Sequence, residues 1–302
     1  METELGLLDL LSVTVLMDDY AGYDSGLLSQ HGASYLVEAG YRHSDKAGRT
    51  ILFDTGQSAG PVLNNMQALG KDPQEIDLFF LSHCHYDHTG GLAGILKASN
   101  RCRLPVIAHP EIFRPQYTVK PSLRPVGMGP ENSLEVVKAA GGEMILTREP
   151  LTLMPGVIST GAITERTSFE ASPTLSLITL VDGRQKNDQM PDDTSLVCIM
   201  REGLVIVTGC SHAGIISIIE KAIALTGINK VAALIGGFHL IDAEDDRIEN
   251  TIERLEKLEI GLIYTGHCSG LKAEALLMDR FKDRFYKLRT GMVIEIPSRK
   301  EG

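Results

Sequence analysis

The sequence of 302 residues predicts an α/β fold, a layered sandwich in which helices cover the sheets and a functional site lies at one edge. Two observations carry this prediction. Apolar stretches of strand length alternate with amphipathic stretches of helix length, which is the pattern of sheets covered by helices. The alternation occurs in both halves of the chain, and several apolar stretches run directly into histidine, cysteine or aspartate.

The first half contains five expected strands and two expected helices. The strands are rich in β-branched or aromatic residues and are bounded by glycine, aspartate or proline. They are expected at residues 11–16, 33–38, 50–53, 78–81 and 105–108. The helices are expected at about residues 60–69 and 90–97.

The second half repeats this order with five strands and three helices. The strands are expected at residues 175–181, 195–200, 204–208, 230–235 and 262–265, and the helices at about 214–225, 245–257 and 272–281. In the helix at 245–257, Ile248, Ile252 and Leu255 recur at helical spacing, with charged residues on the other face. The chain contains no internal repeat of 20–50 residues and no low-complexity tract.

The segment at 114–130 interrupts the alternation. It contains four prolines and two glycines, which disfavour both helix and strand. A long irregular loop in a compact domain is often a lid or a binding loop. The basic residues Arg114, Lys120 and Arg124 in this segment, with Arg166 further along, are expected to meet a substrate phosphate; the alternative is a solvated connector.

The composition excludes several kinds of partner. The chain has 29 Lys and Arg against 39 Asp and Glu, a net charge of −10, so we expect no nucleic-acid partner. Its apolar stretches are too short to span a bilayer, so we expect no membrane partner. The first residues, 1–4, lack the features of a signal peptide, and five cysteines form no disulfide framework. We therefore expect a cytoplasmic protein.

Residues 81–92, Leu-Ser-His-Cys-His-Tyr-Asp-His-Thr-Gly-Gly-Leu, contain the strongest functional motif. His83, His85, Asp87 and His88 fall within six positions, directly after an apolar run. Imidazole and carboxylate are ligands of zinc, iron and manganese. Because side chains alternate along an extended segment, His83 and His85 can face one ion, while Asp87 and His88 at the start of a helix can face a second ion.

Three later apolar stretches also end in glycine followed by ligand-type residues. They are Thr-Gly-Cys-Ser-His at 208–212, Gly-Gly-Phe-His at 236–239 and Thr-Gly-His-Cys at 265–268. Functional residues of α/β sheets gather at the carboxyl ends of strands, so these motifs are expected to join the first cluster. His31, which precedes another expected strand, is a weaker candidate.

These motifs together resemble the metallo-β-lactamase-fold superfamily. The signature is His-Cys-His-Tyr-Asp-His at 83–88, and Leu-Phe-Asp-Thr-Gly at 52–56 resembles the superfamily's first motif. The stretches near 30 and at 208–215, 236–240 and 265–270 resemble one branch, the dihydropteroate-synthase-like group named for an archaeal enzyme of methanopterin synthesis. The likeness runs from about residue 13 to residue 270. It implies an αββα four-layer sandwich of two mixed sheets with helices outside, forming one domain over 1–302 with a lid-like insertion near 114–130.

The sequence also departs from that branch. Ala162 and Glu165 replace an acidic and a basic position of the usual Thr-Gly-Glu-Ile-Pro-Arg pattern, and Ser217 stands where asparagine is common. The mid-chain histidine of most superfamily members is missing, and His212 is our candidate to replace it.

The resemblance implies a binuclear centre with two divalent metal ions, for which we expect zinc, with iron and manganese as alternatives. We assign metal 1 to His83, His85 and His212, and metal 2 to Asp87, His88 and His267. Cys210 lies where many relatives have a bridging aspartate and is a further metal candidate. Asp54 is expected to accept a hydrogen bond from a ligand imidazole. The catalytic candidates are Asp87, His239 and His31, the two histidines as donors to a phosphate or a leaving group.

Three function classes remain open, the second of them implied by the branch resemblance. The first is a binuclear metal-dependent hydrolase that acts on a small anionic, phosphorylated substrate. The second is a pterin-transferring synthase of the dihydropteroate-synthase-like type that releases pyrophosphate. The third, a metal-binding or redox module without hydrolytic chemistry, would need a partner domain.

Overall fold

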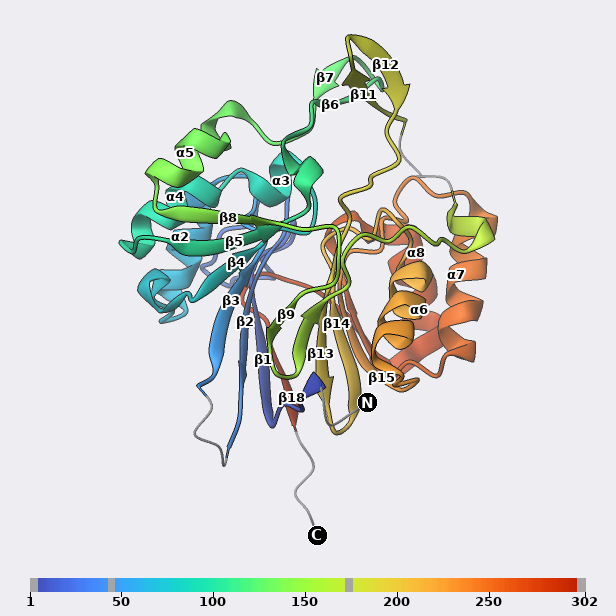
Figure 1. Cartoon of the computed structure of the whole chain (residues 1–302). Helices are drawn as coiled ribbons and strands as arrows, with labels where there is room; N and C mark the ends of the chain where they lie inside the picture. The colour runs from blue at the N-terminus through green and yellow to red at the C-terminus, as the bar shows by residue number, and fades with distance from the viewer. Residues whose placement is uncertain (1–4, 43–46, 172–175, 298–302) are drawn as a thin grey trace.

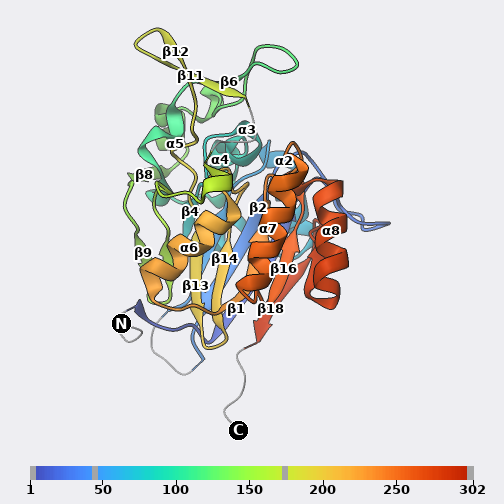
Figure 2. The same cartoon turned by 90° about the vertical axis from the view of Figure 1, so that its right-hand side faces the viewer.

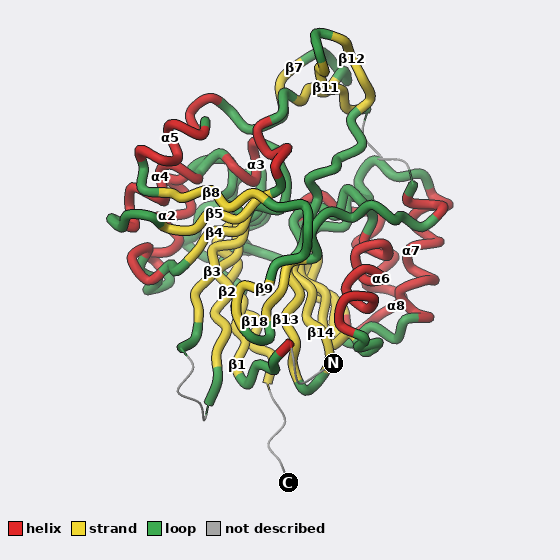
Figure 3. Tube along the Cα trace, viewed as in Figure 1, coloured by secondary structure: helices red, strands yellow, loops and turns green. Residues whose placement is uncertain are grey.

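The computed structural model describes residues 5–42, 47–171 and 176–297 (Figure 1). Two seven-stranded sheets pack face to face in the centre, and helices cover the outer face of each sheet (Figure 3). This is the αββα four-layer sandwich that the sequence predicts. Within the described residues, none of the helices has the length and apolar character needed to cross a membrane.

The first sheet has the strand order β18-β1-β2-β3-β4-β5-β8. Its strands, in that order, are Val293–Pro297, Leu10–Met17, Ser34–Gly40, Arg49–Phe53, Leu78–Phe80, Leu104–Ala108 and Gly142–Leu146. The outer face is covered by α2 (Ala59–Ala68), α4 (Leu92–Ser99) and α5 (Leu134–Ala139), and the short α3 (Tyr86–Thr89) lies at the carboxyl end of β4. The parallel strands β3, β4, β5 and β8 therefore end at the same edge.

The second sheet has the order β17-β16-β15-β14-β13-β10-β9. Its strands, in that order, are Phe285–Lys287, Leu262–Thr265, Val231–Gly236, Gly203–Val207, Leu196–Met200, Val157–Ser159 and Thr152–Met154. The helices α6 (Ile215–Thr226), α7 (Asp245–Lys257) and α8 (Leu271–Phe281) cover its outer face (Figure 2). Because β14, β15 and β16 are parallel neighbours, their carboxyl ends lie side by side.

The hydrophobic core has three main parts that follow the layers. One fills the space between the sheets and includes Val13, Phe53 and Val205. The second lies between the second sheet and its helices, and the third lies between the first sheet and its helices. In α7 the predicted apolar face is confirmed, since Ile248, Ile252 and Leu255 are buried while the rest of the helix is mostly charged.

A separate four-stranded sheet, which we call the lid sheet, extends beyond the sandwich at the top of Figure 1. Its strands, in the order β12-β11-β6-β7, are Arg184–Asn187, Leu177–Val181, Gln116–Thr118 and Arg124–Pro125. The expectation of no strand within 114–130 is therefore wrong, because β6 and β7 gain hydrogen-bonding partners that lie far along the chain. The expected strand at 175–181 belongs to this lid sheet, and residue 175 lies outside the described residues.

The other expected strands and helices are present with ends shifted by a few residues. The elements α5, β8, β9, β10, β12, β17 and β18 are not expected from the sequence pattern. Short 3-10 helices occur at Pro73–Glu75, Pro110–Phe113, Pro130–Asn132, Ser168–Glu170, His267–Ser269 and Lys282–Arg284.

Candidate metal centre

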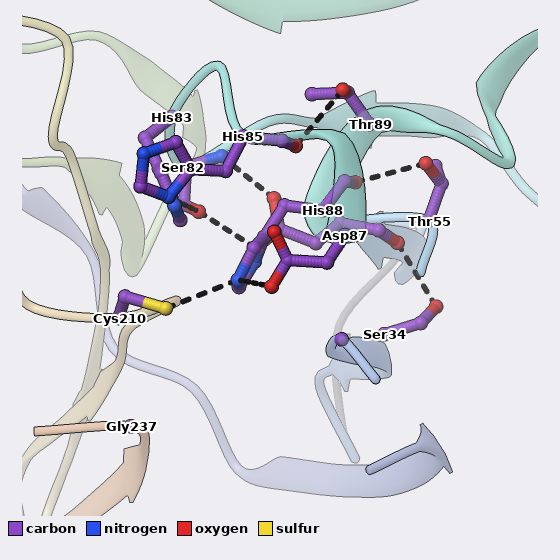
Figure 4. Close-up of polar contacts among 12 residues, drawn as sticks. Ser34, Thr55, Ser82, His83, His85, Asp87, His88, Thr89, Cys210 and Gly237 are labelled. Atoms are coloured by element: carbon purple, nitrogen blue, oxygen red, sulfur yellow. Dashed lines mark hydrogen bonds and ion pairs between the residues drawn. The ribbon is translucent and has the colours of Figure 1, made fainter. Parts of the chain in front are cut away.

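The loop after β4 positions the first cluster of ligand-type side chains. The buried strand ends at Phe80, and a short segment with a bend at Cys84 leads to His85, which is extended and is the N-cap of α3. Asp87 and His88 then lie on the first turn of α3, as the sequence predicts (Figure 4). All four ligand-type side chains of the motif are buried.

The first group comprises His83, His85 and His212. Their ligand atoms all lie within 4.8 Å of one another, and His212 Nε2 is 3.2 Å from His85 Nδ1. Burial lowers the pKa of His85 to about 4, and burial with neighbouring histidines lowers the pKa of His83 and His212 well below the ordinary value. The three imidazoles are therefore neutral, which is the form that binds a metal.

The second group comprises Asp87, His88 and His267. Asp87 Oδ2 lies 3.4 Å from His88 Nε2 and 3.2 Å from His267 Nε2, and the two Nε2 atoms are 3.3 Å apart. Burial disfavours charge on His267, but hydrogen bonds to Asp19 and Asp87 outweigh it and raise its pKa well above the ordinary value. The structure thus brings together all six residues that the sequence assigns to two metals, three in each group.

Unpartnered nitrogen atoms show that these side chains fit metal ions. The Nε2 atoms of His83 and His85 are buried and have no hydrogen-bond partner. The His83 ring lies 4.2–4.8 Å, centroid to centroid, from the rings of His85, His88 and His212. Buried polar atoms in proteins are almost always paired, so such a cluster is unfavourable unless a cation lies between the nitrogens.

Asp54 and Ser82 support two of the ligand-type histidines through hydrogen bonds. The carboxylate of Asp54 accepts hydrogen bonds from Ser82 N (2.8 Å), Ser82 Oγ (2.6 Å) and His88 Nδ1 (2.6 Å). The role expected for Asp54 is confirmed, since a carboxylate at Nδ1 places the free lone pair on Nε2. Ser82 Oγ is also 2.8 Å from His83 Nδ1, so one buried carboxylate supports two ligand-type histidines.

Asp19 supports two further histidines of the site through hydrogen bonds. It accepts hydrogen bonds from His267 Nδ1 (2.7 Å) and from His31 Nδ1 (2.9 Å). His31 is half exposed, and its Nε2 lies 3.4 Å from Asp87 Oδ2. His31 therefore lies at the rim of the site rather than among the buried ligands, and the hydrogen bond to Asp19 raises its pKa.

A third group adjoins the first two and comprises Cys210, His239 and Cys268. Their ligand atoms also lie within 4.8 Å of one another. Cys210 Sγ is 3.1 Å from His88 Nε2 (Figure 4), and the His239 ring lies 4.1 Å from the His212 ring, centroid to centroid. Cys210 and His239 are site residues expected from the sequence, whereas Cys268 is not.

Several residues of these loops have backbone conformations that side chains rarely adopt. Asp54, Ser211, His239 and His267 all have φ between 44° and 57°, in the left-handed region. Such conformations are uncommon for residues other than glycine, and they occur preferentially at functional sites. Here each one lies just after a strand and turns a ligand loop into the site.

A cavity of about 310 Å³ opens onto the second and third groups. Its walls include the catalytic candidates His31, Asp87 and His239, with Arg124 from β7 of the lid sheet and Lys120 from the connection between β6 and β7. The expectation that Arg114 and Arg166 also face the substrate is wrong. Arg114 is buried against Asp188 and Asp192, and Arg166 donates to the backbone carbonyls of residues 189 and 190.

Sequence reasoning missed three further supporting residues. Asp19 follows β1 by two residues, and Asp192 and Asp193 precede β13. Asp192 Oδ2 accepts from Cys84 N (2.7 Å) and Asp193 Oδ2 accepts from Ala213 N (2.6 Å), so each holds a ligand loop in place. For Asp19 a signal was available, since it follows an apolar strand as the ligands do.

Comparison with known proteins agrees with this geometry. The profile of the Metallo-beta-lactamase superfamily matches residues 30–160. A 7,8-dihydropterin-6-methyl-4-(beta-D-ribofuranosyl)-aminobenzene-5'-phosphate synthase of Methanocaldococcus jannaschii is 44% identical over 293 residues, 96% of this chain and 98% of the relative. The chain belongs to the metallo-β-lactamase superfamily. Within that superfamily it is closely related to this synthase, and it is an enzyme.

Solved structures show the same fold. Tm1679, described as a metal-dependent hydrolase of the beta-lactamase superfamily, superposes with a TM-score of 0.76 at 26% identity, over 95% of this chain and all of that one. Zn²⁺-bound PqqB from Methylobacterium extorquens has the same fold, with a TM-score of 0.54 at 14% identity over 94% of this chain and all of that one. The metallo-β-lactamase superfamily fold expected from the sequence motifs is therefore confirmed.

Proposed function

We propose that this enzyme is a pterin-transferring synthase, which joins a 7,8-dihydropterin to a ribofuranosyl-aminobenzene phosphate and releases pyrophosphate. The observation that carries the proposal is the 44% identity to a synthase named for that product, over nearly the full length of both chains. This relationship favours the synthase over a hydrolase as the main function.

We propose two divalent metal ions at the first and second groups, zinc first, with iron or manganese as alternatives. His83, His85 and His212 would hold one ion, and Asp87, His88 and His267 would hold the other. Bound there, divalent ions would supply Lewis acidity toward a pyrophosphate leaving group. The neutral imidazoles of the first group and the carboxylate of Asp87 support this assignment.

The proposed reaction forms one bond and breaks another. The amino nitrogen of the aminobenzene attacks the methylene carbon on the pterin, and a carbon–nitrogen bond forms. The carbon–oxygen bond to pyrophosphate breaks, and its electron pair leaves with pyrophosphate. The amine loses one proton, and Asp87, His31 and His239 line the cavity as the groups able to accept or relay it.

Positively charged residues in and next to the lid sheet could bind the phosphate groups of both substrates. Lys120 and Arg124 line the cavity, and in a chain of net charge −10 they bring local positive charge to it. We propose that the chain acts as one domain and that segment 114–130 with its lid-sheet partners limits water access over the site. A transferase needs this protection, because water competes with the amine for the pterin carbon.

A second candidate, hydrolysis of a small phosphorylated substrate, is favoured by the likeness to a metal-dependent hydrolase at 26% identity. We place either activity in the cytoplasm, because Cys84, Cys210 and Cys268 are unpaired thiols buried at the site and Cys198 is an unpaired thiol buried in the core between the sheets.

One assay separates the two candidates. The purified, metal-loaded enzyme receives dihydropterin-methyl pyrophosphate with and without the aminobenzene phosphate, and pyrophosphate and pterin products are measured. A synthase gives the coupled product and releases pyrophosphate much faster when the amine is present. Equal release without the amine, with hydroxymethylpterin as the product, would instead establish the hydrolase. Arg124→Ala should weaken competitive inhibition by pyrophosphate about tenfold without loss of metal.

A further inference from the structure

Two side chains of the third group, His239 and Cys268, are not used by the two-metal centre, while Cys210 also lies within 4.8 Å of the ligand atoms of His83 and His88. Cys210, His239 and Cys268 are all buried, and their ligand atoms lie within 4.8 Å of one another. Both ring nitrogens of His239 lack a hydrogen-bond partner. A buried imidazole with two unpaired nitrogens beside two sulfur atoms is unfavourable unless something binds between them.

The fold places each of these three side chains at the same position after the end of a strand. The parallel strands β14, β15 and β16 are neighbours in the second sheet and end at Val207, Gly236 and Thr265. Cys210, His239 and Cys268 each follow the end of their own strand by three residues. Three adjacent parallel strands therefore present one ligand each at the same sheet edge.

Local packing leaves space for the sulfur atoms. A Cβ atom on Gly237 would lie 2.5 Å from Cys268 Sγ, so only glycine is compatible with the thiol in this position. Cys268 Sγ donates weakly to the Cys210 carbonyl at 3.7 Å, which leaves its lone pairs available. All three side chains also line the cavity of about 310 Å³, so an ion held by them would have one side facing the substrate space.

We propose that Cys210, His239 and Cys268 form a third metal site, for a thiophilic divalent cation such as Zn²⁺ or Cd²⁺. Two sulfurs and one imidazole are a soft donor set, and three protein ligands leave a fourth position open toward the cavity. The Cys210 thiolate would be shared with the second group, because it lies 3.1 Å from His88 Nε2. The site borders the proposed synthase centre through Cys210 and His239, but its metal content and thiolate absorption can be measured without the synthase reaction.

The test is a titration of the full-length, chelator-stripped protein with Cd²⁺. It measures bound metal per chain and the ultraviolet absorption from thiolate-to-metal charge transfer. The wild-type protein should bind three ions and show this absorption. Cys268→Ala should bind two ions and lose roughly half of the absorption, because one of two thiolates is gone.

Cys198→Ala is the matched control, because Cys198 is a buried thiol in the core between the sheets. It should behave as wild type. His239→Ala should weaken the third ion by at least about tenfold, and it tests the site even where Cys268→Ala fails to fold. His85→Ala should keep the thiolate absorption, which separates this site from the first group.

Binding of two ions or fewer by the wild-type protein would overturn the proposal, with or without thiolate absorption, because Cys210 alone could give that absorption from the two-metal centre. The proposal would also be overturned if Cys268→Ala had the same metal content and the same thiolate absorption as Cys198→Ala. Loss of synthase activity in the coupling assay has no bearing on either readout, so the two proposals fail separately.

Discussion

The two sheets contribute to the metal centre in different ways. The first sheet supplies four ligand-type residues from one loop and one short helix, at 83–88. The second sheet supplies its ligand-type residues from three separate strand ends, at 210–212, 239 and 267–268. A contiguous motif is easily recognised in a sequence, whereas a distributed set depends on the register of neighbouring strands. The first contribution is thus local, and the second is a property of the whole sheet.

Among the variants that test this difference between the two sheets, His85→Ala has the largest expected effect. We expect loss of at least one metal ion per chain and a fall in activity of more than about 100-fold, above the range typical for outer partners of metal ligands. Elemental analysis of the purified protein checks the metal content. His109→Ala is the control, because His109 is a buried histidine that only caps a short helix. Equal metal content in the two variants would contradict the ligand assignment.

Asp54→Asn and Asp19→Asn compare the two sides directly. Asp54 is fully buried and supports His88 and, through Ser82, His83, whereas the Asp19 side chain is 40% exposed and supports His267. We expect Asp54→Asn to weaken metal binding about 10- to 100-fold and Asp19→Asn by less than about tenfold, since water can replace part of the Asp19 contact. Competition with a chelator measures both values. A larger loss of metal affinity in Asp19→Asn than in Asp54→Asn would contradict this expectation.

A smaller effect concerns the base of the lid sheet, where the two halves meet. Arg114 precedes β6 in the first half, and its Nε donates to Asp188 Oδ2 (2.7 Å) just after β12 in the second half. Asp188→Asn should lower the free energy of unfolding by about 2 kcal/mol at pH 7, because a buried charged hydrogen bond is lost. Urea denaturation checks this value. Asp279→Asn, in an exposed pair with Lys282, should have no measurable effect.

The pair of Arg114 and Asp188 also predicts that the free energy of unfolding depends on pH. Burial raises the pKa of Asp188, but the hydrogen bonds from Arg114 outweigh it and hold the pKa below the ordinary 3.8. A carboxylate with a lowered pKa stabilises the folded state above the unfolded pKa, and this contribution disappears as the pH falls through the folded pKa. The stabilities of the wild-type protein and Asp188→Asn should therefore converge below about pH 3.8. A constant difference down to acid pH would exclude the charged pair.

The sequence predicts those parts of the structure that are recorded in local patterns. The apolar runs that form β3, β4, β14, β15 and β16 are long enough to be recognised, and glycine and ligand-type residues mark their ends. The placement of His212 with His83 and His85 is predicted from the strand-end rule together with the family resemblance, although these residues lie far apart in sequence.

What the sequence does not predict depends on partners far along the chain. The strands β6, β7 and β17 have three residues or fewer and, unlike β4, do not lie within a longer apolar run. Arg114 has the same local character as Arg124, and only the fold reveals that Arg114 is neutralised by Asp188 and Asp192. Cys268 carried a usable signal, since it follows its strand by the same interval as Cys210 and His239.

The pairing of β18 with β1 has a consequence for synthesis of the protein. Six strands of the first sheet lie within residues 10–146, but the seventh, β18, lies at 293–297. During translation the outer edge of β1 therefore stays unpaired until nearly all described residues have left the ribosome. An unpaired apolar edge is a site for mispairing between nascent chains. Ribosome-bound intermediates of this protein should thus need protection by a chaperone at that edge until the last strand docks.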